Sequence, residues 1–283
     1  MRAIAEYIMR GRKEAIIVAT VSAAIPMMYW VSAAAVTLVV LRKGWTQGLA
    51  LLFWAVLPAG VWWVIRNDPT PMLVILGSTV LAHVLRTTVS WVYTLFAGVL
   101  LGLILSWFLP LLLPDVLAAF VSMGNEFLDQ IAAQTGSQIT EKLKEILPGM
   151  FSGVLSAAHV LSIVGSVILG RWWQSLLFNP GGFKTEFQQL ILPKTVAVPV
   201  FFVMAFGGEV NPAMLGWVPV LGIPFVVAGI ALIHGIVALK KLSLHWLVAF
   251  YVSMFFVGPY LTLLLILLAS LDSIFDFRRR IKP

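Results

Sequence analysis

The chain has 283 residues, of which 60% are hydrophobic and 11% charged, and its mean hydropathy is +0.99. Soluble domains carry about 25% charged residues, so this composition excludes a water-soluble fold and indicates a protein whose solvent is lipid. The net charge is +7, with Lys and Arg scattered at the ends of apolar runs, a pattern typical of membrane topology; we expect no nucleic-acid partner. The sequence contains no cysteine, which excludes disulfides and thiolate catalysis.

The first two apolar runs are short for a membrane crossing, which needs about 20 residues. They cover residues 15–28 and 31–41, after a polar, amphipathic start at 1–13. They predict either one bent helix, interrupted at Pro26, or a pair of short helices. Basic residues precede the first run and Arg42-Lys43 follows the second. Keeping both sets in the cytoplasm requires two crossings, so we favour the pair.

Further apolar runs follow along the chain, and the last of them, with Gly258-Pro259 in its middle, predicts one tilted helix or two short ones. The pattern therefore predicts an all-α, polytopic transmembrane helix bundle with about eight to ten crossings. We interpret residues 1–283 as a single membrane domain. The runs cover residues 45–65, 72–85, 89–113, 151–170, 195–206, 217–239 and 244–271.

Residues 115–147 are amphipathic rather than uniformly apolar. Apolar residues recur at helical spacing in two stretches, which a break at Thr135-Gly136 separates, and charged residues occupy the other side of the second stretch. This predicts an extramembrane helical hairpin on the non-cytoplasmic side. Such a hairpin either joins two spans at the surface or caps a cavity.

The most polar segment between spans is RWWQSLLFNPGGFKTEF, at residues 171–187. It predicts a cytoplasmic loop over 171–194, anchored at the headgroups by Arg171 and Trp172. Asn179-Pro180-Gly181-Gly182 is a strong turn signal. The spacing of a phosphate-binding loop is absent, so we exclude a nucleotide site. The loop functions either as a hinge or as a surface that moves or docks, carried by Arg171, Trp172, Asn179, Gly181 and Gly182.

A polar stripe runs along the span that precedes this loop. Ser152, Ser156, His159 and Ser166 share one helical face, and such a face must meet protein or water rather than lipid. We expect His159, Ser156 and Ser166, together with His83 from an earlier span, to line a ligand-binding interior. The alternative is that these side chains only hydrogen-bond neighbouring helices.

Small residues recur at every fourth position of the first run, at Ala15, Ala19 and Ala23. This spacing lets helix backbones approach closely, either inside the chain or at a docking face for a partner. The sequence has no motif of a hydrolase or metalloprotease and no pair of acidic residues within a span. We therefore expect no enzyme activity, catalytic residue, metal or cofactor.

The run at 171–187 and the ending LDSIFDFRRR at 271–280 resemble the YybS-like family of predicted bacterial membrane proteins of unknown function. That family has been grouped with the substrate-binding S components of energy-coupling-factor vitamin transporters. The resemblance covers nearly the whole chain. It implies a multi-pass protein of the bacterial inner membrane, a small-molecule pocket, and docking of Ala15, Ala19 and Ala23 on a transmembrane coupling partner. The chain departs from the S components in having more spans and no vitamin-binding motif.

These observations favour an inner-membrane protein that binds a small solute in its helix bundle, as a transporter or substrate-capturing subunit with a separate energy-supplying partner. Two other hypotheses stay open. One is a non-catalytic scaffold that recruits envelope or membrane-assembly proteins. The other is a lipid-handling protein with its ligand near Arg86 and Arg171.

Overall fold

The computed structural model describes residues 1–135 and 139–280, and across these ranges the chain is helical without strands. This confirms the all-α polytopic bundle. The N-terminal half comprises α1 (Arg2–Arg10), α2 (Arg12–Ala24), α3 (Tyr29–Lys43), α4 (Trp45–Arg66), α5 (Thr70–Thr88), α6 (Trp91–Leu112) and α7 (Pro114–Thr135). The C-terminal half comprises α8 (Ile139–Phe178), α9 (Gly182–Gln188), α10 (Lys194–Val210), the 3-10 helix η1 (Pro212–Trp217), α11 (Val218–Leu221), α12 (Ile223–Leu239), α13 (His245–Phe275) and α14 (Phe277–Arg280).

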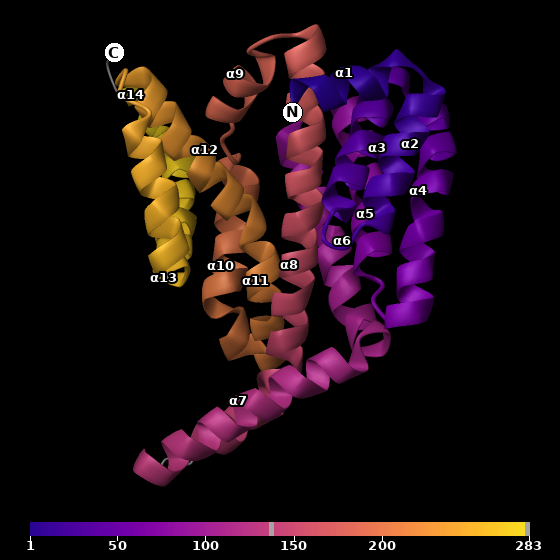
Figure 1. Ribbon diagram of the computed structural model, residues 1–283. Helices are drawn as coiled ribbons and strands as arrows, with labels where there is room; N and C mark the ends of the chain where they lie inside the picture. The colour runs from indigo at the N-terminus through magenta and orange to yellow at the C-terminus, as the bar shows by residue number, and fades with distance from the viewer. Residues whose placement is uncertain (136–138, 281–283) are drawn as a thin grey trace.

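The longest helix, α8, occupies the middle of the bundle, with α1–α6 on one side and α10–α14 on the other (Figure 1). Six stretches of the described chain are long and apolar enough to cross a membrane. They are α4, α5, α6, α8 from Glu141 onward, the stretch Pro212–Leu239, and α13. The chain is therefore a multi-pass membrane protein. The six stretches are fewer than the expected eight to ten crossings because α2, α3 and α10 are shorter than 18 residues.

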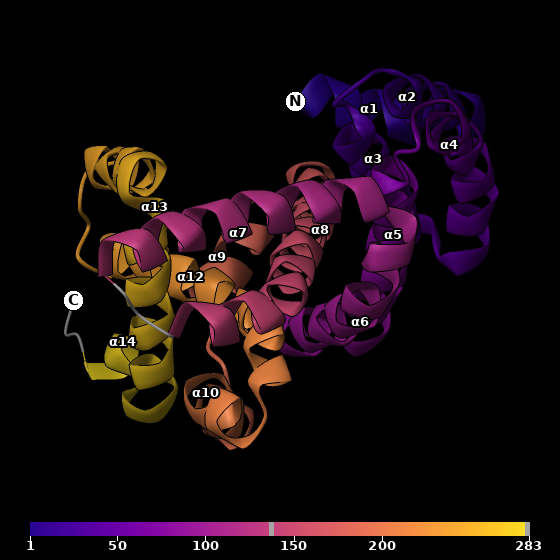
Figure 2. The same cartoon turned by 90° about the horizontal axis from the view of Figure 1, so that it is seen from below.

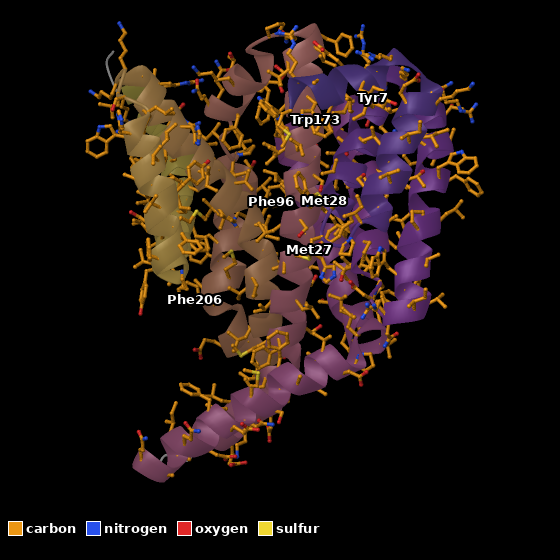
Figure 3. The ribbon with its side chains drawn as sticks, viewed as in Figure 1. Tyr7, Met27, Met28, Phe96, Trp173 and Phe206 are labelled. Carbon is orange, nitrogen blue, oxygen red and sulfur yellow. The ribbon has the colours of Figure 1, made fainter. Side chains whose placement is uncertain are left out.

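The first two apolar runs form two helices, as favoured from the charges. α2 and α3 pack against each other and are joined by a turn at residues 25–28, where Met27 has a φ of 61°. Met27 and Met28 lie about halfway down the bundle (Figure 3). Arg12 and Lys43, at the outer ends of the two helices, line the same small cavity. The pair is therefore a hairpin that enters the bundle from one end and returns to that end.

The last apolar run is also a hairpin. The helical conformation of α13 breaks at Val257 (φ −124°, ψ 33°), just before Gly258 and Pro259, because proline lacks an N–H and its ring clashes with the preceding turn. Tyr251, before the break, contacts His234 of α12. Arg278, after it, lies against the neighbouring Gly235. Both arms of α13 therefore lead to the same end of α12, and of the two predicted arrangements the structure has the two short helices.

The two ends of the bundle differ in charge. Basic residues at or near the ends of α3, α5, α8 and α12 gather at the end drawn uppermost in Figure 1, where α1 and α14 lie; we call it the basic end. The opposite, acidic end carries the basic residues Arg66, Lys142 and Lys144. It also carries seven acidic residues, namely Asp68, Asp115, Glu126, Asp129, Glu141, Glu145 and Glu209. The positive-inside rule predicts that the basic end faces the cytoplasm.

At the acidic end, α7 projects from the bundle and crosses beneath it (Figure 2). It pairs with the first turns of α8: Lys144 Nζ lies 2.7 Å from an Asp129 carboxylate oxygen, and the Phe120 and Phe151 rings stack. This is the predicted amphipathic hairpin. Its second arm is continuous with the following span, since α8 runs through Pro148, inside the helix, as far as Phe178. The break predicted at Thr135-Gly136 falls largely on 136–138, outside the described residues.

Candidate functional site

The polar stripe of α8 is buried and faces protein. The Ser152 hydroxyl donates to the Ser106 carbonyl at 2.5 Å, and the Ser156 hydroxyl donates to the Gly102 carbonyl, so both hold α8 against α6. The Ser166 hydroxyl donates within α8, to the Ser162 carbonyl at 2.8 Å. A hydroxyl in an apolar interior needs such a partner, and these three side chains have one.

His159 is also satisfied by protein partners. Its Nδ1 lies 2.8 Å from the Leu155 carbonyl, which can only accept, so Nδ1–H donates there and Nε2 accepts from the Thr70 hydroxyl at 3.3 Å. Thr70 begins α5, whereas His83 lies near its other end, about 20 Å away along the helix axis. The structure therefore places Ser152 and Ser156 against α6 and His159 against α5, and it does not bring His83 to any of them.

His83 instead contacts Trp45 at the basic end, with 4.5 Å between ring centroids. Arg86, one turn further on, donates to the carbonyls of Val40 at 3.0 Å and Leu41 at 2.5 Å. These carbonyls are at the C-terminus of α3, where a cation is favourable. Arg86 thus caps a neighbouring helix through Nη1.

The alanine face of α2 is buried within the chain. Ala15, Ala19 and Ala23 are each at most 4% exposed, and α2 packs against α3 and α4. Internal packing, one of the two alternatives, accounts for this spacing, because small side chains let the helices approach closely.

The Asn-Pro-Gly-Gly turn folds the chain back onto the end of α8. Gly181 adopts a φ of +85°, which favours glycine. The Ser175 hydroxyl donates to the Asn179 carbonyl at 2.7 Å and accepts from the Phe183 N–H at 3.0 Å. A Cβ at Gly182 would lie 2.2 Å from the Asn179 side-chain nitrogen. The turn residues thus set the position of α9 against α8.

Arg171 secures the other side of α9. Its guanidinium donates to both carboxylate oxygens of Glu186, with 3.1 Å between Nε and Oε2, and to the Gln174 side chain at 3.0 Å. Gln174 in turn lies 3.4 Å from the Leu41 carbonyl of α3. The 171–194 segment is therefore attached to the bundle through charged and backbone groups rather than held at the headgroups alone.

A cleft opens between α8, α9, α12 and α13, at the basic end. Its volume is about 490 Å³, within the range of about 300–1,000 Å³ typical of small-molecule sites. The apolar lining is Ile168, Trp172, Leu176, Phe183, Phe187, Val227 and Ile230. The polar lining is Ser175, Lys184, Gln188, His234 and Tyr251. Trp172 and Gly181, two of the loop residues predicted from sequence, contribute to this cleft.

A series of aromatic contacts runs through Phe183, Phe187, His234 and Tyr251, which line the cleft, and extends from Phe183 to Trp91 of α6. Centroid distances are 6.0 Å from Trp91 to Phe183, 5.6 Å from Phe183 to Phe187, 5.6 Å from Phe187 to His234 and 5.9 Å from His234 to Tyr251. His234 Nε2 also lies 2.9 Å from the Tyr251 hydroxyl. This aromatic ladder links α6, α9, α12 and α13. All of these contacts except the tilted Phe183–Phe187 pair are edge-to-face, and such contacts stabilise beyond the area that they bury.

A second cavity of about 480 Å³ adjoins the first, because Lys184, Gln188 and His234 line both. The second cavity adds Lys241 and the turn between α12 and α13. We call the two together the basic-end groove. No Asp or Glu of the described residues is among those that line it.

The sequence pointed to the loop but missed the opposite wall of the groove. Two sequence patterns could have indicated the groove. They are the four-residue spacing of Phe183 and Phe187 and the position of His234 within an apolar run. Tyr251 had none, because only the fold of α13 brings it to α12.

The fold and the groove define a multi-pass α-helical membrane protein with a ligand-sized cleft at one end of the bundle. No family model, curated protein or solved structure matches the chain. Within residues 1–135 and 139–280, no cluster of three or more His, Cys, Asp or Glu side chains is arranged to hold a metal ion.

Proposed function

We propose that this protein binds a small amphiphilic molecule in the cleft between α8, α9, α12 and α13, as a substrate-binding or transporting component of a bacterial inner membrane. The observation that carries the proposal is the cleft itself, whose lining is mainly apolar and includes a few polar side chains. This combination is the usual form of a small-molecule site. The polar stripe of α8 serves helix packing in this proposal, since its groups already have partners.

The walls of the cleft differ in how firmly they are packed. α8 is central and largely buried, whereas the first arm of α13 is mostly exposed and is tied to α12 through the His234–Tyr251 hydrogen bond. Elements with few buried contacts are those that open at low free-energy cost. We assign entry and exit of the ligand to a movement of this arm.

The proposal assigns binding rather than catalysis to the cleft. Because the sequence has no nucleotide-binding motif, active transport would need a partner protein that supplies energy. The resemblance to the YybS-like family and its S-component relatives agrees with this division of labour, and it remains a prediction.

The test is native mass spectrometry of the protein purified gently from its own membrane. We expect a bound small molecule or lipid to be retained by the wild type and lost from Ile230→Trp, which fills the apolar part of the cleft. The matched control is Leu100→Trp, at a side chain 62% exposed on α6. An empty wild-type chain that carries a stoichiometric protein partner instead would contradict the proposal and favour the scaffold hypothesis.

A further inference from the structure

The basic-end groove is polarised along its length. The cavity between α8 and α12 has predominantly apolar walls, and the adjoining one brings Lys184 of α9 and Lys241 of the α12–α13 turn to the same space. The groove therefore offers an apolar compartment continuous with a cationic one. A ligand that fits both must carry an apolar part and a negative group.

Neither lysine is neutralised by a protein partner. Both are exposed, and none of the ion pairs or side-chain hydrogen bonds among the described residues includes them. Glu186, the acidic residue nearest to Lys184 in sequence, forms an ion pair with Arg171. The ammonium groups are thus available to an external anion, in contrast to Arg86, Arg171 and Arg278, which are bound to carbonyls or carboxylates.

The backbone at Lys241 is unusual for a residue of this type. Its φ is +51°, a left-handed conformation at the end of α12, where glycine or asparagine is usual. The Lys241 N–H donates to the Ala238 carbonyl at 3.2 Å. This conformation costs free energy in residues that have a side chain beyond glycine's hydrogen. The residue that adopts it here is a lysine that lines the groove.

We infer that the ligand of the groove is a membrane lipid with an anionic phosphate headgroup, its phosphate between Lys184 and Lys241 and an acyl or prenyl chain along the aromatic ladder. This inference rests on the proposed function and names its substrate class. A lipid is favoured over a soluble phosphate ester because Lys184 lines the apolar compartment itself and Lys241 lines the cavity that adjoins it. The groove also lies at the basic end, which the positive-inside rule predicts to face the cytoplasm. The cytoplasmic leaflet is the one that carries anionic lipids.

The experiment titrates the full chain in detergent with three probes and follows binding by native mass spectrometry. The probes are phosphatidylglycerol, phosphatidylcholine with the same acyl chains, and glycerol 3-phosphate. We expect phosphatidylglycerol to bind more tightly than phosphatidylcholine, by about fivefold for each lysine. We expect glycerol 3-phosphate to bind far more weakly than either lipid.

The decisive variant is Lys184→Gln with Lys241→Gln, which should lower the affinity for phosphatidylglycerol to that for phosphatidylcholine and leave the latter unchanged. Its control, Lys13→Gln with Lys194→Gln, removes two exposed lysines that do not line the groove and should keep the preference. A full preference in the decisive variant would overturn the headgroup assignment. Equal affinity of the wild type for glycerol 3-phosphate and phosphatidylglycerol would overturn the lipid assignment in favour of a soluble phosphate ester.

The Ile230→Trp variant separates this inference from the proposed function. If both lipids bind to it as they do to the wild type, the cleft is not the binding site and the proposed function fails. If Ile230→Trp loses both lipids while Lys184→Gln with Lys241→Gln still prefers phosphatidylglycerol, binding in the cleft is supported and only the headgroup inference fails.

Discussion

Tyr251 and His234 meet across the contact between α13 and α12, with 2.9 Å between the phenol oxygen and Nε2 and 5.9 Å between the ring centroids. The pair closes one side of the cleft and ties the exposed first arm of α13 to the bundle. A side-chain hydrogen bond contributes about 1 kcal/mol.

Tyr251→Phe keeps the ring contact and removes the hydroxyl. We expect backbone amides of residues 245–257 to exchange faster with deuterium, by about fivefold for a loss of about 1 kcal/mol. Residues 260–275, which pack along α12, should exchange as in the wild type. Exchange that rises equally in both arms would show that α13 opens as one unit.

The ending LDSIFDFRRR contains a buried ion pair. Asp272, 2% exposed, lies 2.5 Å from the Arg278 guanidinium, which also donates to the carbonyls of Gln188 and Leu190, each at 2.8 Å. Asp272→Asn leaves Arg278 without its counter-charge, and we expect a loss of about 3 kcal/mol or more in unfolding free energy. Arg279→Gln, at a side chain 88% exposed, should change it by about 1 kcal/mol or less. Denaturation in detergent would compare them, and equal effects would refute the structural role of the pair.

Two glycines of α8 form a matched pair for testing how closely the helices pack. A Cβ at Gly153 would lie 1.7 Å from the Gly216 carbonyl oxygen, a backbone atom, whereas a Cβ at Gly165 meets nothing within 4 Å. Gly153→Ala should therefore force α8 and η1 apart and cost about 2 kcal/mol or more. Gly165→Ala should be neutral or stabilising by up to about 1 kcal/mol. The readout is the midpoint of thermal aggregation in detergent, and similar midpoints for both variants would contradict the close approach.

Ser156→Ala tests whether the polar stripe serves packing or binding. It removes the hydroxyl that donates to the Gly102 carbonyl, and we expect a loss of about 1 kcal/mol or less in stability with lipid affinity unchanged. Ser162→Ala is the control, because the Ser162 hydroxyl donates to its own helix, at the Ala158 carbonyl. Reduced ligand affinity in Ser156→Ala alone would restore the stripe as a binding surface.

The absence of cysteine from the sequence allows a direct test of topology. Single cysteines can be introduced at Ser243, just before α13, and at Arg279, just after it. Because α13 is a hairpin, both should react with an impermeant thiol reagent only from the cytoplasmic side. A cysteine at Ser122 of α7 should react only from the opposite side. Labelling of Ser243 and Arg279 from opposite sides would mean that α13 crosses the membrane fully.

The sequence alone determined that the chain is helical, apolar and multi-pass, because the 3.6-residue period and the length of an apolar run depend only on local order. It also located the turn at Asn179–Gly182 and the amphipathic arm at 115–147, since Gly, Pro and patterned charges act locally. The pairing of the first two runs followed from Arg42-Lys43 and the charges before residue 15.

Only the tertiary structure decided which polar residues are free. Ser156, His159 and Arg86 looked available in sequence, yet each meets a group from another helix, more than 40 residues away in the chain. Lys184 and Lys241 were not among the site residues predicted from sequence, yet the fold leaves them without an ion-pair partner among the described residues, beside an apolar cleft. Hydrogen bonding and charge pairing between distant segments depend on how the helices pack, and helical periodicity carries no information about that packing.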